Sequence, residues 1–197
     1  MEFFDVVDGQ RACRAFRPDP VDDELVERVL RAATGAPSAE NRQPWAFVVV
    51  RDEGLRAGVG ELARRAWEAG GRAYAEGRLP PALLADVDRG ARGGVAGAPV
   101  LVVVCGDTRV GHPAAMAASV FPAVQNLLLA AVALGLGSAM TTLPLTGGDE
   151  LAALLDLPPE VVPMAVVPLG WPARPLGPPR RSPVAEKTHR DRYGNPW

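Results

Sequence analysis

The sequence has few of the residues that build metal and redox sites. Its two cysteines, Cys13 and Cys105, lie far apart without a CxxC spacing. Its two histidines, His112 and His189, have no carboxylate cluster at metal-ligand spacing beside them. These patterns argue against a zinc site and a dithiol pair. We expect buried thiols in a reducing compartment, and histidines on the surface or in loops.

Charge of one sign is also lacking, because the net charge is only -2. Such a chain has no strong field for nucleic acid or acidic membranes, so a small molecule is the expected partner. No basic segment followed by an apolar run stands at the N-terminus, which predicts a cytoplasmic protein. With 197 residues and 48% hydrophobic content, residues 1–197 are expected to form a single domain.

Three common catalytic motifs are missing as well. The sequence contains no GxSxG nucleophile elbow, no P-loop, and no GxGxxG after a strand. Acyl transfer, nucleotide hydrolysis and Rossmann dinucleotide binding therefore have no support. The longest apolar run, residues 121–140, approaches the length of a membrane span, but Pro122, Gln125 and Asn126 interrupt it. We expect a buried helix there.

The apolar patterns predict an α+β domain in which helices cover a small sheet. Helices are expected over residues 3–8, 22–34, 114–134 and 149–155, and strands over 45–50, 100–105, 138–142 and 161–169. The strands at 45–50 and 100–105 are predicted to be buried on both faces. Residues 55–97 predict one or two helices with a mobile middle at 77–81. Residues 172–197 are expected to form an extended arm around a partner subunit, because loops of this length are uncommon.

Three polar segments are candidates for a binding site. The first is QRACRAF, in which Arg11 and Arg14 would point at a phosphate or an electron-rich ring, or form a solvated charge run. The second is APSAENRQPWAF, residues 36–47, whose amides would either read a flat polar heterocycle or satisfy one another. The third is the pair Arg180 and Arg181, which would contact phosphate or keep the arm soluble.

The second segment carries a family resemblance. It has the form P-S-x-x-N-x-Q-P-W-x-F at residues 37–47, and residues 123–131 followed by Leu-Gly-Leu-Gly supply a second hallmark. Together with the two arginine segments, these motifs resemble the nitroreductase family over nearly the whole chain. The resemblance implies a mostly antiparallel central sheet and a homodimer with exchanged C-terminal arms. It also implies that FMN lies in clefts shared between the two subunits.

The resemblance further assigns roles to individual residues. Arg14 would lie near the pyrimidine edge of the flavin, and the backbone N–H groups of Thr142 and Leu143 near its N5 and O4 atoms. The implied FMN-binding residues are Gln10, Arg11, Arg14, Pro37, Ser38, Ala39, Asn41, Thr142, Leu143, Arg180 and Arg181. Pro37, Ser38 and Asn41 would serve the flavin bound mainly by the other subunit, and Arg181, with Arg180, would hold the phosphate.

The family pattern has Arg and Ser where this chain has Gln10 and Ala12. The loss of one charge-assisted contact would weaken FMN binding by about 1–2 kcal/mol. Ping-pong hydride transfer from NAD(P)H to a nitroaromatic, quinone or enone is implied, and no catalytic side chain is required. Two alternatives remain open: a flavin-dependent dehydrogenase or oxidase using oxygen, and a non-catalytic flavin-binding protein. Trp67, Tyr74 and Phe121 either line the substrate pocket or belong to the core.

Overall fold

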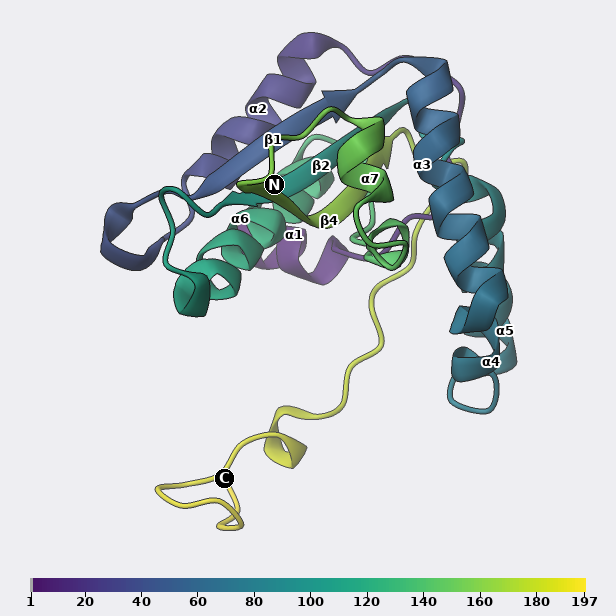
Figure 1. The fold of residues 1–197 in the computed structure, drawn as a ribbon. Helices are drawn as coiled ribbons and strands as arrows, with labels where there is room; N and C mark the ends of the chain where they lie inside the picture. Colours follow the sequence, from purple (N-terminus) through teal and green to yellow (C-terminus); the bar gives the residue numbers. More distant parts are fainter. Residues whose placement is uncertain (1) are drawn as a thin grey trace.

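The centre of the fold is a four-stranded antiparallel sheet with the order β1-β2-β4-β3 (Figure 1). This computed structural model describes residues 2–197. The strands are β1 (Trp45–Val50), β2 (Val100–Asp107), β3 (Gly137–Ser138) and β4 (Val161–Gly170). The predicted α+β class and the small antiparallel sheet are therefore confirmed.

The two strands that were expected to be buried on both faces differ in their positions. All residues from Val100 to Cys105 in β2 are fully buried, because β2 pairs with β1 on one side and β4 on the other. For β1 the prediction holds only in part: Trp45 and Phe47 pack against one core cluster and Ala46 and Val48 against the other, but Val49 is 37% exposed. β1 is an edge strand with a paired neighbour on one side only, so its residues are less enclosed than those of β2.

One face of the sheet is covered by α2 (Asp23–Thr34) and α6 (Pro113–Ala133), as Figure 1 shows. Val102 and Val104 point to this face and share a core cluster with Val29 and Leu127. By length and composition alone α6 would be able to cross a membrane. One face of α6 instead packs in the core against α2 and the sheet, while Phe121 is 36% exposed, so the expectation of a buried helix holds for that face only.

The opposite face is covered by α3 (Glu53–Ala66) and α7 (Glu150–Leu154). Leu101 and Val103 alternate with the valines of the first face and pack in a second core cluster with Val59 and Leu151. This alternation follows from the two-residue period of a strand. A β2 strand that is apolar at every position therefore supplies both cores.

The segment between β1 and β2 is a helical unit with two π-helical turns, the first of which is kinked at Gly70. After α3 come η2 (Trp67–Gly71), α4 (Arg72–Ala75), α5 (Pro81–Arg89) and η3 (Gly90–Gly94). The prediction of helices here is confirmed, and the break between α4 and α5 covers residues 76–80, close to the predicted 77–81. Insertions of this π type occur often at functional sites.

Several predicted bounds shift. The strand expected over residues 138–142 is shorter, because regular pairing stops after Ser138 and only Thr141 forms a further bridge, to Val166. The amide of Ala139 still donates to the carbonyl of Pro168, at 3.4 Å. Proline has no N–H to donate in return, so the ladder breaks at this point. The helix expected over residues 3–8 is α1 (Phe3–Gly9).

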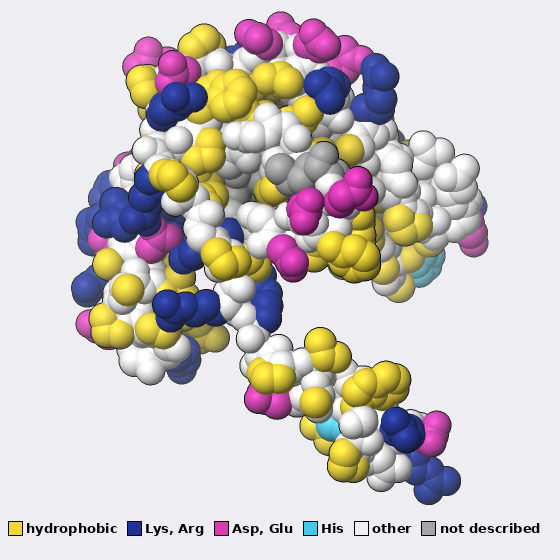
Figure 2. Space-filling view, turned by 180° about the vertical axis from the view of Figure 1, so that it is seen from behind, with side chains coloured by type: hydrophobic (Ala, Val, Ile, Leu, Met, Phe, Trp, Pro, Cys, Tyr) yellow, Lys and Arg dark blue, Asp and Glu magenta, His cyan; other side chains and the backbone are white. Residues whose placement is uncertain are grey.

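The C-terminal segment leaves the body of the molecule. The first residues after β4 stay attached, since Ala173 donates its backbone N–H to the carbonyl of Ala15 and Trp171 donates its indole N–H to Pro20. Beyond them the chain projects outward and contains the short turn η5 (Val184–Glu186) and an isolated bridge between His189 and Pro196 (Figures 1 and 2). The structure thus shows an extended arm, and its exchange with a partner subunit stays a prediction.

Candidate functional site

A largely apolar cavity of about 270 Å³ lies where the N-terminal segment, the end of the sheet and the helical unit meet. Its walls include Phe16, Trp67, Val87, Val95, Met140 and Leu143. Arg14 is the charged residue in this lining. An apolar cavity with one fixed cation suits a flat, electron-rich ring.

Two glycines allow Arg14 to approach the cavity. A Cβ atom on Gly94 would lie 2.4 Å from the carbonyl oxygen of Arg14, and one on Gly90 would lie 2.7 Å from its Cδ atom. Both glycines belong to the π-helical turn η3. The turn therefore packs directly on the backbone and the side-chain stem of Arg14.

Asp86 of α5 holds the guanidinium group of Arg14. The Nη1 atom of Arg14 lies 2.9 Å from Oδ2 of Asp86, and both side chains are mostly buried. Burial raises the pKa of Asp86, but hydrogen bonds from Arg14 and Arg89 outweigh this effect and keep its pKa below the usual value. Asp86 is therefore ionised at neutral pH and keeps Arg14 in place.

A second, smaller cavity of about 160 Å³ adjoins the first and shares Cys13 and Arg14 with it. Three arginines, Arg11, Arg14 and Arg174, line it together with Asp86. Arg174 donates from Nη2 to Oδ1 of Asp86 at 3.1 Å. Three cations facing one carboxylate leave an excess of positive charge, which suits a phosphate group.

Arg174 was missed at the sequence level, where the pair Arg180 and Arg181 stood out instead. The sequence signal that could have identified Arg174 is its short distance from the last strand. Arg174 follows the last strand by only four residues, so it stays near the body of the fold. Arg180 and Arg181 lie on the projecting arm, and Arg181 bonds to the carbonyl of Arg180. Neither of them lines the two cavities.

Thr142 and Leu143 lie at the apolar cavity, as predicted. They follow the bridge at Thr141, and Leu143 begins the 3-10 turn η4 (Leu143–Leu145). The backbone N–H of Leu143 donates to Oγ1 of Thr141 at 3.3 Å. The turn therefore presents its first residues to the same space as Arg14.

The loop of residues 36–44 forms a separate region. Ser38 accepts a hydrogen bond from the amide of Gln43 at 2.9 Å, and Ser119 accepts one from the amide of Ala39 at 3.2 Å. The side-chain amide of Gln43 also donates to Oδ1 of Asn41. Within one chain, the loop's polar groups therefore satisfy one another, which was one of the two alternatives left open.

The same loop has an unusual backbone. Glu40, Asn41 and Gln43 all have φ values between 51° and 54°, in the left-handed region that non-glycine residues seldom adopt. Such conformations persist when the surroundings enforce them, and they cluster at functional sites. The loop borders a third cavity of about 530 Å³ through Ala39, Glu40, Arg42 and Pro44.

The structure of the single chain thus brings together only some of the predicted site residues. Arg11, Arg14, Thr142 and Leu143 line the two adjoining cavities. Pro37, Ser38, Ala39 and Asn41 lie in the other region, whose cavity shares no lining residue with these two. Gln10 is the C-cap residue of α1 and lines none of the three. That the loop residues of one subunit meet the cavity residues of the other in a homodimer stays a prediction.

No side chain at the adjoining cavities has the character of a nucleophile or a metal site. Cys13 is buried and donates from Sγ to the carbonyl of Ala15 at 3.3 Å. Burial raises the pKa of its thiol, so the thiol is protonated at neutral pH. Among residues 2–197, no group of three His, Cys, Asp or Glu side chains is placed to hold a metal ion.

Comparison with known proteins agrees with this geometry. Residues 7–171 match the Nitroreductase family. A relative from Methanothermobacter thermautotrophicus, named for NADH dehydrogenase and NAD(P)H nitroreductase activity, is 30% identical over 90% of this chain and 81% of its own. The 5,6-dimethylbenzimidazole synthase of Rhodospirillum rubrum is 36% identical over 83% of this chain and 78% of its own.

Solved structures show the same fold. An iodotyrosine deiodinase bound to FMN and 3-iodo-L-tyrosine superposes with a TM-score of 0.77 at 26% identity, covering 98% of this chain and 100% of that one. The match extends over nearly all of the described residues and includes the sheet and both helical layers. This chain belongs to the nitroreductase family and is an oxidoreductase of that family.

Proposed function

We propose that this protein is an FMN-dependent oxidoreductase that passes electrons from NAD(P)H to a small organic acceptor such as a nitroaromatic, a quinone or an enone. One observation carries the proposal: the apolar cavity at Arg14 opens beside a pocket lined by Arg11 and Arg174. FMN likewise has a flat ring, which would fit the apolar cavity, and a phosphate group, which would fit the arginine-lined pocket. The donor set therefore fits FMN.

The residues at the cavities would divide the binding task. The walls at Phe16, Met140 and Leu143 would hold the flavin ring, which leaves Trp67 and Val87 for the acceptor. The guanidinium of Arg14 would stabilise negative charge that develops on the flavin ring. The turn at Thr142 and Leu143 would orient the ring edge through backbone N–H groups, and the N–H of Leu143 would exchange its bond to Oγ1 of Thr141 for one to the ring. When bound, FMN supplies the hydride acceptance and release, so the chain has to supply binding, orientation and exclusion of water.

We further propose that the active species is a homodimer in which Pro37, Ser38, Ala39 and Asn41 of one subunit reach the flavin of the other. Three features support this. The loop is held in a strained conformation at the surface, and the arm with Arg180 and Arg181 projects from the body (Figure 2). In addition, Phe3 and Phe4 of α1 are 66% and 76% exposed, which is unfavourable unless another surface covers them.

The acceptor depends on walls that the helical unit supplies. Relatives of this chain carry names as different as 5,6-dimethylbenzimidazole synthase and iodotyrosine deiodinase. The family's fold therefore supports several reactions, and the pocket walls select among them. In this chain, Trp67, Val87 and Val95 are the large residues that the helical unit contributes to the cavity.

An absorbance spectrum of the purified protein, before and after anaerobic addition of NADH or NADPH, tests the proposal. Visible flavin bands that bleach with nicotinamide support the reductase. Bands that bleach only with an organic substrate and recover in oxygen favour the oxidase alternative, and bands that never bleach favour a flavin-binding protein. A colourless protein that ignores added FMN would contradict the proposal.

A matched pair of variants locates the site. Arg14→Ala removes the cation at the cavity and is expected to weaken FMN binding by roughly tenfold or more, as the loss of a charge-assisted contact does. Arg17→Ala removes the same charge three residues away, where the side chain pairs with Asp19 and lies over Trp171 instead. Arg17→Ala is expected to bind FMN like the wild type. Equal losses in both variants would count against the site.

A further inference from the structure

We propose that Asp88 is a positioning residue for acceptor selection: by accepting the indole N–H of Trp67, it fixes the cavity wall against which an acceptor ring lies. The inference rests on the proposed function and adds a residue outside the cavity itself. It is based on the contacts by which two π-helical turns and a network of charged side chains fix the side chain of Trp67.

Trp67 is a wall residue that the surroundings hold from several sides. It is 3% exposed, and it packs with Ala75, Ala91 and Leu143. A Cβ atom on Gly71 would lie 3.0 Å from Cε3 of the indole, so this glycine leaves room for the ring. The ring is therefore confined by packing, and its one polar group decides which way it faces.

That polar group is bonded to a carboxylate. The Nε1 atom of Trp67 donates to Oδ1 of Asp88 at 2.9 Å. A buried indole N–H needs an acceptor, and a charged acceptor forms a stronger bond than a neutral one. This bond is the largest cause of the lowered pKa of Asp88, which keeps the carboxylate ionised at neutral pH. A flipped indole would lose this partner.

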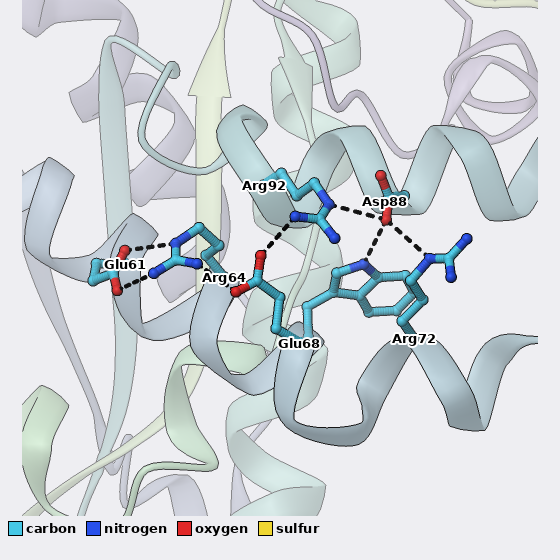
Figure 3. A network of polar contacts seen from close by, with 7 residues as sticks. Glu61, Arg64, Glu68, Arg72, Asp88 and Arg92 are labelled. Carbon is cyan, nitrogen blue, oxygen red and sulfur yellow. Dashed lines mark hydrogen bonds and ion pairs between the residues drawn. The ribbon is translucent and has the colours of Figure 1, made fainter.

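Asp88 is itself held by two arginines. Nε of Arg92 lies 3.2 Å from Oδ1 of Asp88, and Nε of Arg72 lies 3.5 Å from the same atom. Figure 3 shows Asp88 on one helical segment, facing side chains from the segment that carries Glu68 and Arg72. The carboxylate therefore links the two segments and cannot follow the indole if the ring rotates.

The network continues away from the cavity. Arg92 also pairs with Glu68 at 2.6 Å, Glu68 pairs with Arg64, and Arg64 pairs with Glu61 at 2.6 Å (Figure 3). These outer side chains are more exposed than Asp88, and exposed pairs contribute little. Glu61 belongs to the same network without a bond to Asp88 or Trp67, so it provides a control.

The two π-helical turns place this arrangement at the cavity. Trp67 is the first residue of η2, and Gly90, Ala91 and Gly94 of η3 line the same space. Trp67 thus lies on one turn, and the carboxylate that holds it lies two residues before the other. The first turn carries the indole at the cavity, and Asp88 reaches the indole N–H from the last turn of α5, outside the cavity. An acceptor ring in this cavity would contact the indole that Asp88 orients.

The test uses flavin-loaded enzyme and two quinones, small p-benzoquinone and larger bicyclic menadione. The ratio of their kcat/KM values does not depend on flavin content or on the NAD(P)H half-reaction, since these affect both acceptors equally. Asp88→Ala is expected to lower the menadione to p-benzoquinone ratio by roughly tenfold. Asp88→Asn, which keeps an oxygen acceptor, is expected to restore most of the ratio. Glu61→Gln is expected to leave it unchanged.

A second measurement follows the indole directly and needs no flavin. In the ¹⁵N-labelled protein, Trp67→Phe identifies the Trp67 indole signal by its loss. Asp88→Ala is expected to shift that signal and to accelerate its hydrogen exchange, whereas Glu61→Gln is not. In the Trp67→Phe background, Asp88→Ala is expected to cause no further change in the acceptor ratio, because the group it acts through has gone.

Each outcome decides one point. Unchanged exchange in Asp88→Ala overturns the proposed anchor. Faster exchange with an unchanged acceptor ratio overturns the role in selection, as does a further fall in the ratio in the double variant. A chain that binds no FMN fails the proposed function itself, whereas a flavin-loaded enzyme with an unchanged ratio refutes only this inference.

Discussion

Substitution of Gly94 by alanine tests whether the π-helical turn η3 sets the position of Arg14. The added Cβ atom would lie 2.4 Å from the carbonyl oxygen of Arg14 and 3.2 Å from its carbonyl carbon. Both are backbone atoms, so no flexible side chain can move aside. Either the turn or the N-terminal segment has to shift by about 1 Å before ordinary van der Waals separation is reached.

The expected magnitude combines two opposing effects. Overpacking of this kind costs about 1–3 kcal/mol. Replacing glycine by alanine in a helical segment recovers up to about 1 kcal/mol. We therefore expect Gly94→Ala to lower the free energy of unfolding by about 1–2 kcal/mol. Because the shift also moves Arg14, we expect FMN to bind roughly tenfold more weakly.

Gly93→Ala is the matched control, since it lies in the same turn and has nothing within 4 Å of its added Cβ atom. It gains the helical contribution without the clash, so its stability is expected to equal or exceed that of the wild type. Urea unfolding and flavin titration of both variants provide the measurement. If Gly94→Ala is as stable as Gly93→Ala and binds FMN equally well, the argument that η3 fixes Arg14 is wrong.

Three further predictions concern individual side chains. Asp86→Asn loses the ion pair with Arg14, which is expected to lower the free energy of unfolding by about 1–2 kcal/mol at neutral pH. The pKa of Asp86 is lowered on folding. The loss of stability in Asp86→Asn is therefore present above the unfolded pKa of about 4 and disappears as the pH falls through the folded pKa. Urea unfolding at several pH values measures this dependence. Burial raises the pKa of Cys105 to about 11 and that of Cys13 in the same direction, so a disulfide reagent such as DTNB is expected to react with both thiols only after unfolding. Gln10→Arg is expected to tighten FMN binding by roughly 5- to 30-fold in a flavin titration, the equivalent of about 1–2 kcal/mol for one charge-assisted contact, and an unchanged affinity would show that Gln10 lies away from the phosphate.

The layers of the fold were predictable because they depend on local patterns. The apolar run at residues 100–105 predicts a buried strand, and the spacing of Val26, Val29 and Ala33 predicts the helix that covers it. The position of a strand within the sheet depends on pairing between distant segments. For this reason the run at residues 45–50, with a similar composition, did not indicate that its strand lies at the edge of the sheet and is less buried than β2.

The candidate site was predictable only in part, for the same physical reason. Arg14 and Leu143 belong to recognisable segments, and the fold brings them together. Other site residues act through contacts between distant positions. Asp86 lies 72 positions from Arg14 and 88 positions from Arg174, and Asp88 lies 21 positions from Trp67. No local pattern distinguishes these residues from the other charged side chains of the helical unit and the arm.

The loop of residues 36–44 and the C-terminal arm differ in how much conformational entropy each would lose on binding FMN. Hydrogen bonds to Ser38 and Ser119 already hold the loop in its strained conformation, so its ordering entropy is lost on folding and not on binding. The arm at Arg180 and Arg181 projects without such support, so a phosphate contact from there has to order the segment as well. Arg174 is held by Asp86 at 3.1 Å before any ligand arrives. Per contact, Arg174 is therefore expected to contribute more to phosphate affinity than either arginine of the arm.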